Sequence, residues 1–178
     1  MKSKAFLFLV AVQAFVVIGL SAYHGYHRAS GISILLETVP VDPRDMLRGD
    51  YVILRYKIST LRSNLFAAPL PSGNEAEGRT VYVTLENHDR FHEAVSASFD
   101  PPGPEPGQVV ISGTVRNSWT ENELRVEYGL ERYYVAEGTG NPIGKITAEV
   151  SVSPSGRGII REVFIDDQPY AEVMGIDR

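Results

Sequence analysis

Charged residues are densest just ahead of an aromatic-flanked apolar segment at positions 51–56. Arginine and aspartate can form ion pairs there. The order Asp-Pro favours a turn, because proline fixes φ and aspartate accepts hydrogen bonds from nearby backbone N–H groups, and glycine suits a positive φ. We predict a salt-bridged turn that sets the register of a strand, with a polar docking patch as the alternative. The residues concerned are Asp42, Arg44, Asp45, Arg48, Gly49 and Asp50.

A second group of residues combines carboxylates with phenols. Paired carboxylates can serve acid–base catalysis when burial separates their pKa values, and neighbouring aromatic rings could bind a sugar or a peptide. Spacing along one strand does not make such side chains converge. The pattern therefore favours a strand with exposed glutamates and half-buried tyrosines. The group comprises Glu127, Tyr128, Glu131, Tyr133, Tyr134 and Glu137.

Two pairs of histidines have spacings that a metal site could use. His24 and His27 are three positions apart, and His88 and His92 flank a probable turn near acidic residues. Zinc sites combine histidine, cysteine and carboxylate ligands at recognisable spacings, and no such motif surrounds either pair. We expect surface histidines, with no metal and no cofactor.

Nucleophilic catalysis has little support in the sequence. The chain has no cysteine, which excludes disulfides, thiol catalysis and thiolate metal sites. It also lacks a Gly-x-Ser-x-Gly nucleophile elbow and a glycine-rich phosphate loop ahead of a helix. Lys57 and Ser59 fall two residues apart on one face of a predicted strand, so a Ser-Lys pair is an alternative without diagnostic context.

The N-terminal segment predicts a membrane anchor. Lys2 and Lys4 precede an uncharged, mostly apolar run from Ala5 to Ala22. A helix of about 18 to 20 apolar residues spans the hydrocarbon core, and the lysines favour a cytoplasmic N-terminus. A cleaved signal peptide is the alternative, but the run exceeds the usual apolar length, and Leu20 stands where a small residue is preferred ahead of a cut after Ala22.

The rest of the chain predicts one mostly β domain over residues 32–178, after an anchor and interfacial collar over residues 1–28. Apolar residues recur with period two between turn signals, without an amphipathic helix. Roughly eight short strands are typical of an antiparallel β-sandwich or open barrel. We expect them at 32–39, 51–59, 80–87, 91–99, 108–116, 124–128, 145–153 and 158–166, with a loop at 61–78 that begins in a helical turn.

Bulk composition limits the classes of function. A chain of 178 residues is long enough for one domain with its own core. A hydrophobic content of 43% with 22% charged residues is typical of a folded domain rather than of a disordered or multi-span protein. The net charge of −5 argues against nucleic-acid binding, because phosphates require a clustered basic surface.

One pattern matches a known family. Gly49, Asp50, Tyr51, Leu54 and Tyr56 occupy every named position of the GDYXXLXY motif, and the segments 40–45 and 128–138 also look like that family. The chain therefore resembles the GDYXXLXY protein family. The resemblance implies a bacterial, membrane-associated protein of uncharacterised function that accompanies, or is fused to, multi-pass membrane proteins. It implies no catalytic residues.

These features together lead us to expect a non-enzymatic, single-span protein of the bacterial inner membrane. Its β domain would lie on the periplasmic or outer side and contact a multi-pass membrane partner. One alternative is a cell-envelope hydrolase for peptide or glycan, which uses Glu131, Glu137 or the Ser-Lys pair. Another is a β-barrel that binds a small molecule or lipid in an apolar cavity. Besides the charged turn, the expected interaction residues are Tyr51, Leu54, Tyr56, Tyr128, Glu131, Tyr134 and Glu137.

Overall fold

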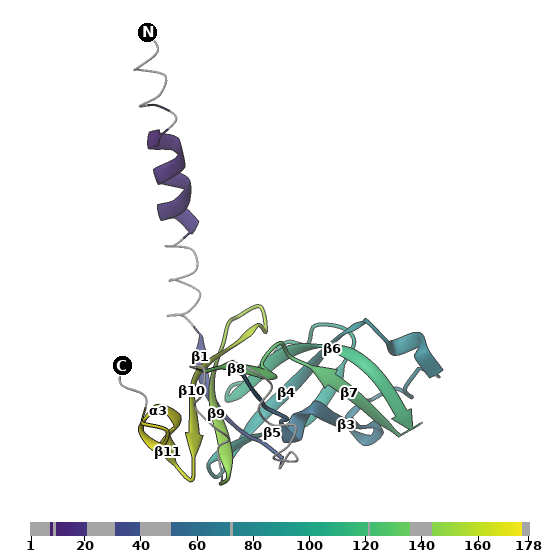
Figure 1. The fold of residues 1–178 in the computed structure, drawn as a ribbon. Helices are drawn as coiled ribbons and strands as arrows, with labels where there is room; N and C mark the ends of the chain where they lie inside the picture. Colours follow the sequence, from purple (N-terminus) through teal and green to yellow (C-terminus); the bar gives the residue numbers. More distant parts are fainter. Residues whose placement is uncertain are drawn as a thin grey trace. The chain divides into compact units, whose positions relative to one another are not determined.

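The computed structural model describes residues 8, 10–20, 31–39, 51–71, 73–120, 122–135 and 144–175. For residues 73, 74 and 117–120 it describes the backbone alone. The chain divides into two compact units, Met1–Gly31 and Ile32–Arg178, and Figure 1 traces both.

The first unit contains a helix over residues 10–20. Its large apolar side chains are exposed, including Phe15 at 78% and Ile18 at 67% of their full accessible area. The predicted anchor from Ala5 to Ala22 lies partly outside the described residues, and the predicted collar at 23–28 lies wholly outside them. Within the described part of the chain, no helix is both long and apolar enough to cross a membrane.

The second unit consists of antiparallel sheets (Figure 1). One sheet has the strand order β1-β9-β10-β11, another has the order β3-β7-β6-β4-β5, and β2 pairs with β8. The prediction of a mainly β, antiparallel domain is confirmed, and the described strands do not close into a barrel. The strands are β1 (Ile32–Glu37), β2 (Tyr51–Ile53), β3 (Thr60–Arg62), β4 (Thr80–His88), β5 (Phe91–Ser98), β6 (Gln108–Thr120), β7 (Glu123–Glu127), β8 (Arg132–Tyr134), β9 (Ile146–Val152), β10 (Gly158–Ile165) and β11 (Gln168–Pro169).

Helical segments in this unit are short. Three are single 3₁₀ turns, and one is a brief α-helix that follows β11. The three 3₁₀ turns lie between strands, whereas α3 follows the last of the described strands. Their bounds are η1 (Lys57–Ser59), η2 (Ser63–Leu65), η3 (Gly73–Ala76) and α3 (Tyr170–Val173).

Two of the predicted hairpins show how alternation and turn residues set the fold. In β4 the inward residues Val81, Val83 and Leu85 are fully buried, and β4 pairs with β5 as expected. The turn between β9 and β10 contains Gly156 at a φ of 83°, a region that glycine enters without steric cost. Its carbonyl accepts the N–H of Ser112 at 2.8 Å, which ties this hairpin to β6 of the other sheet.

The strand expected at 51–59 is shorter than predicted. It ends at Ile53, and η1 follows, because the N–H of Ser59 donates to the carbonyl of Tyr56 at 3.0 Å. The Ser59 hydroxyl also accepts the N–H of Tyr56 at 3.3 Å, a local bond of the kind with which serine competes against strand ladders. The loop expected at 61–78 begins later than predicted, since Leu61 lies in β3, fully buried opposite Leu124 of β7. The helical turn expected at 61–67 is present as η2.

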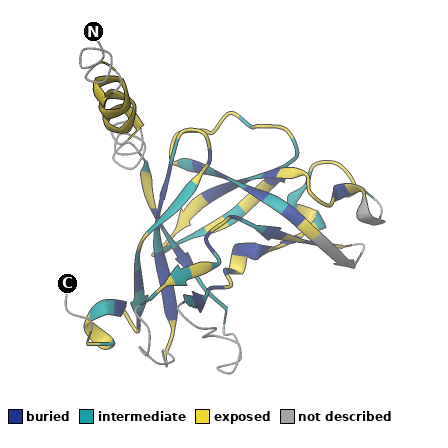
Figure 2. Ribbon diagram, turned by 45° about the horizontal axis from the view of Figure 1, so that its top comes forward, coloured by how far each residue is buried: buried dark blue, intermediate teal, exposed yellow. Residues whose placement is uncertain are grey.

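One hydrophobic core joins the two larger sheets, and Figure 2 shows buried positions along strands of both. Burying a Val, Leu or Ile side chain contributes about 1.5 to 3 kcal/mol, so this shared core is the main source of stability. Tyr170 of α3 extends it and packs edge-on against Tyr133 with ring centroids 5.4 Å apart. Fully or almost fully buried members include Ile34, Leu36, Val81, Val83, Ile111, Leu124, Ala148, Val150 and Val163.

An ionic cluster connects β1 to two other segments. The Glu37 carboxylate accepts from the Lys145 ammonium at 2.6 Å and also pairs with Lys57. The two ammonium groups lower the pKa of Glu37 because they stabilise its ionised form. The cluster therefore links β1 to the start of η1 and to the residue before β9.

We expect the substitution Glu37→Gln to destabilise the domain by about 1 kcal/mol at pH 7, because partly exposed ion pairs are individually weak. The lowered pKa means that this contribution is complete above the unfolded value of about 4.3 and disappears as the pH falls through the folded value. Urea unfolding at pH 7 and pH 3 measures it. The gap between wild type and Glu37→Gln should shrink at pH 3, whereas a gap that persists would contradict the assignment. Glu105→Gln, at an exposed position, is the control.

Candidate functional site

The pairing of β2 with β8 brings together the two groups of residues that the sequence singled out. Tyr51 lies opposite Tyr134, and Ile53 lies opposite Arg132. Beyond the strands, the N–H of Leu54 donates to the carbonyl of Glu131 at 2.8 Å. Two stretches that lie far apart in the sequence therefore form one two-stranded ribbon, which we call the β2–β8 ribbon.

The exposed side of the β2–β8 ribbon carries an aromatic pair and an arginine. The rings of Tyr51 and Tyr134 lie 5.9 Å apart and are tilted by 58°, an arrangement that stabilises cross-strand pairs. The guanidinium carbon of Arg132 lies 5.4 Å from the Tyr51 ring centroid, within the range of a cation–π contact. Tyr134 nevertheless keeps 70% of its surface exposed. We call these three residues the tyrosine–arginine face.

Two buried phenols lie on the inner side of the β2–β8 ribbon, next to its strands. The Tyr56 hydroxyl donates to the carbonyl of Leu130 at 2.8 Å, and the Tyr128 hydroxyl donates to the carbonyl of Ile58 at 2.7 Å. Burial raises the pKa of both tyrosines, and the nearby charge of Glu131 adds to the effect. Both phenols therefore stay neutral donors, and they hold the segment after β2 against the segment before β8.

Glu131 has a structural position rather than a catalytic one. Its Oε1 accepts the N–H of Tyr128 at 2.6 Å, which closes a tight turn in which Gly129 adopts a φ of 76°. Gly113 on β6 leaves room for this turn, because a Cβ there would lie 2.9 Å from the Tyr128 ring and 2.4 Å from Val126. The Glu131 carboxylate therefore orders the backbone beside the tyrosine–arginine face.

A cleft of about 220 Å³ lies beside the face. Its walls include the guanidinium-bearing residues Arg55, Arg125 and Arg132, and buried Leu54 and Val126 also line it. Within the described part of the chain, neither Arg55 nor Arg125 forms an ion pair. We call this hollow the arginine cleft.

The arginine cleft is the part of the site that inspection of the sequence missed. Glu127 also lines the cleft but pairs with Arg116 at 2.7 Å. The sequence did contain a signal for these arginines. Arg55 and Arg125 each lie between two buried neighbours, so the alternation of side chains along an extended chain requires both to point outward. Sequence could not show that two outward positions on separate elements meet.

Several predicted site residues cannot be placed. The charged turn, Asp42 to Asp50, lies outside the described residues, as do Glu137 and the histidines at 24 and 27. The salt-bridged turn thus stays a prediction. Leu54 is buried and supports the site through the backbone bond described above.

The other candidate groups do not assemble into a catalytic or metal centre in the described residues. Lys57 pairs with Glu37, which raises the pKa of Lys57 and keeps it protonated, while Ser59 is buried and bonded to Tyr56. Nδ1 of His92 accepts the N–H of Leu35 at 3.4 Å, and burial lowers the pKa of His92. Across the described ranges, no group of three or more potential ligands is positioned to hold a metal.

Comparisons with known proteins place most of the chain in one match. A family model described as GDYXXLXY protein matches residues 13–163, a range that includes β2, β8 and the arginine cleft. No curated protein and no solved structure matches the chain.

We expect Tyr56→Phe to destabilise the domain by about 1 to 3 kcal/mol, because it leaves the buried carbonyl of Leu130 without its donor. Tyr128→Phe should have a similar effect at Ile58. Tyr134→Phe is the matched control and should change stability by less than about 0.5 kcal/mol, since its ring is largely exposed. Urea unfolding followed by circular dichroism measures all three. Equal stability of Tyr56→Phe and wild type would refute the role of the buried phenols.

Proposed function

The chain belongs to the GDYXXLXY protein family, and from this premise we propose that it is a membrane-anchored, non-enzymatic accessory protein. It binds a multi-pass membrane partner through the tyrosine–arginine face and the arginine cleft. The observation that carries the proposal is the exposure of Tyr134, 70% of whose surface is free beside Tyr51 and Arg132.

Tyrosine and arginine are the residue types that dominate binding energy in protein interfaces. They supply a large contact area and directed hydrogen bonds. Here Tyr51, Arg132 and Tyr134 sit on paired strands whose backbone is fixed by the buried phenols of Tyr56 and Tyr128. A preorganised surface of this kind loses little conformational entropy on binding.

The arginine cleft defines the chemistry of the partner surface. Arg55 and Arg125 present guanidinium groups without a carboxylate partner among the described residues, and guanidinium binds carboxylate in a planar, bidentate geometry. An acidic loop of the partner would complete these pairs. The two glutamates that line the cleft are already engaged, Glu127 by Arg116 and Glu131 by the Tyr128 N–H.

Membrane anchoring is supported by the N-terminal sequence and by its helix. The described helix at residues 10–20 exposes apolar side chains along its whole length, including Val12, Phe15, Val16 and Ile18. A helix that is hydrophobic all round is stable when protein or lipid covers it. In this proposal the uncharged run from 5 to 22 spans the bilayer, and the β domain lies on its outer side.

The length of chain between the proposed anchor and the domain limits how far the start of β1 can lie from the end of the anchor. Ile32 lies ten positions after Ala22, a span of at most about 36 Å when the chain is extended. In this proposal the two larger sheets form a β-sandwich, which is a rigid support for the docking surface.

A hydrolase is not favoured, because Glu131, Lys57 and Ser59 each make a structural contact instead of converging.

We predict that Tyr134→Ala and Arg132→Ala each reduce recovery of a multi-pass partner at least about tenfold, because hot-spot truncations cost about 2 kcal/mol or more. The measurement is co-purification of the whole tagged chain from native membranes, followed by quantitative mass spectrometry. Arg157→Ala, on the turn between β9 and β10, is the matched control. An unchanged partner list with both variants folded would reject the docking surface.

We also predict that the double substitution Val12→Arg and Val16→Arg releases the chain from membranes. Each arginine costs about 2.5 to 3.5 kcal/mol at the centre of a spanning helix. Fractionation after alkaline carbonate extraction measures the release, and the corresponding alanine pair is the control. Wild-type chain that is itself extracted by carbonate would contradict the anchor.

A further inference from the structure

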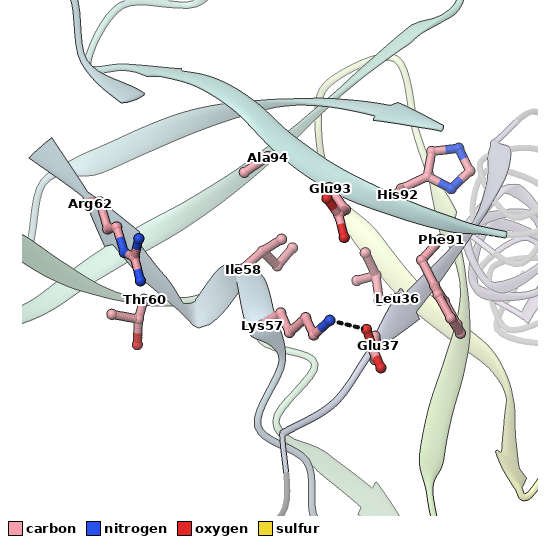
Figure 3. A pocket seen from close by; sticks show the side chains of 10 residues that line it. All are labelled: Leu36, Glu37, Lys57, Ile58, Thr60, Arg62, Phe91, His92, Glu93 and Ala94. Atoms are coloured by element: carbon pink, nitrogen blue, oxygen red, sulfur yellow. Dashed lines mark ion pairs between the residues drawn. The ribbon is translucent and has the colours of Figure 1, made fainter. Parts of the chain in front are cut away.

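A cavity of about 390 Å³ lies between β1, β5 and the segment from η1 to β3 (Figure 3). It exists because the sheets do not close. β1 and β5 are neighbours, but β1 forms its ladder with β9 and β5 forms its ladder with β4. No ladder joins β1 to β5 in the described residues, and side chains line the resulting seam.

Apolar side chains line one part of the cavity. Leu36 comes from β1, Ile58 from η1, and Phe91 and Ala94 from β5. The Lys145 ammonium lies 4.8 Å from the Phe91 ring centroid, so this ring also holds the Glu37 cluster in place. The volume is within the range of about 300 to 1,000 Å³ that is usual for small-molecule sites.

The charged side chains that line the cavity are not all paired with one another. Glu37 is engaged by both Lys57 and Lys145, and the charge of Glu93 acts on Lys57. Arg62 lines the cavity and forms no ion pair within the described residues. Of the two cations that line the cavity, Lys57 is therefore held by Glu37, and Arg62 is the one that no described carboxylate pairs with.

Arg62 is placed to receive an anion. Thr60 and Arg62 are two residues apart on β3, so their side chains share one face of the strand, and both line the cavity. Figure 3 shows them together at one end, with Ile58 between them and the Lys57–Glu37 pair. A guanidinium and a hydroxyl can together donate hydrogen bonds to both oxygens of a carboxylate.

We propose that this cavity binds a small carboxylate that carries an apolar side chain. The carboxylate pairs with Arg62 and Thr60, and the apolar group lies against Leu36, Ile58 and Ala94. The site is separate from the tyrosine–arginine face and does not depend on the proposed docking function. The ligand is either a free N-acylated amino acid or the C-terminal residue of a peptide, because both present a carboxylate next to an apolar side chain.

The test is an NMR titration of the whole chain in detergent, with methyl signals of Leu36, Ile58 and Ala94 as reporters. The probes are N-acetyl-leucine and a capped tetrapeptide that ends in leucine, each compared with its C-terminal amide. We expect at least one acid to shift the three methyl signals, and its amide to bind at least tenfold more weakly. The stronger of the two acids identifies the source of the ligand.

Variants separate the charge from the shape of the site. Arg62→Gln should weaken binding of the acid at least tenfold, and Arg157→Gln should leave it unchanged. Ala94→Leu fills the cavity and should abolish binding, whereas Val95→Leu at the exposed neighbouring position should not. Equal binding of acid and amide, an unchanged affinity of folded Arg62→Gln, or the absence of shifts at the three methyl groups would each overturn the proposal.

Discussion

The buried hydrogen bonds of Tyr56 and Tyr128 are the interaction on which the rest of the site depends. The Tyr56 phenol donates to the carbonyl of Leu130 between β7 and β8, and the Tyr128 phenol donates to the carbonyl of Ile58 in the 3₁₀ turn η1. A buried carbonyl without a partner costs free energy comparable to a lost hydrogen bond. These two bonds therefore satisfy buried carbonyls that lie outside the strand ladders, and they fix the segment after β2 against the segment before β8.

The second organising feature is a seam that stays open. β1 and β5 lie side by side without a shared ladder, and the connection through η1 leaves space between them. The Glu37 cluster lies beside this seam and links β1 to η1 and to the residue before β9. Two different surfaces result, an aromatic one at β2 and β8 and a mixed apolar and charged cavity at β1 and β5.

Local pattern predicted those parts of the fold in which neighbours in sequence are neighbours in space. The hairpins β4–β5 and β9–β10 follow from alternation and from turn residues such as those around Gly156. Burial at Val52, Leu54 and Tyr56 also followed the period of two. The extended conformation did not continue, because Ser59 bonds back to Tyr56 and turns the chain. Leu61 was missed for a different reason, because its partner Leu124 in β7 lies far along the chain.

The sequence by itself determined the antiparallel β class, the absence of thiol chemistry and the resemblance to one family, because composition, period and a short motif are local properties. Only the tertiary structure decided that Tyr51 meets Tyr134, that Glu131 orders a turn, and that Arg62 forms no ion pair with the described residues. Those facts depend on strand register and on which edges stay unpaired. Both are set by long-range packing of the core, which no single stretch of sequence encodes.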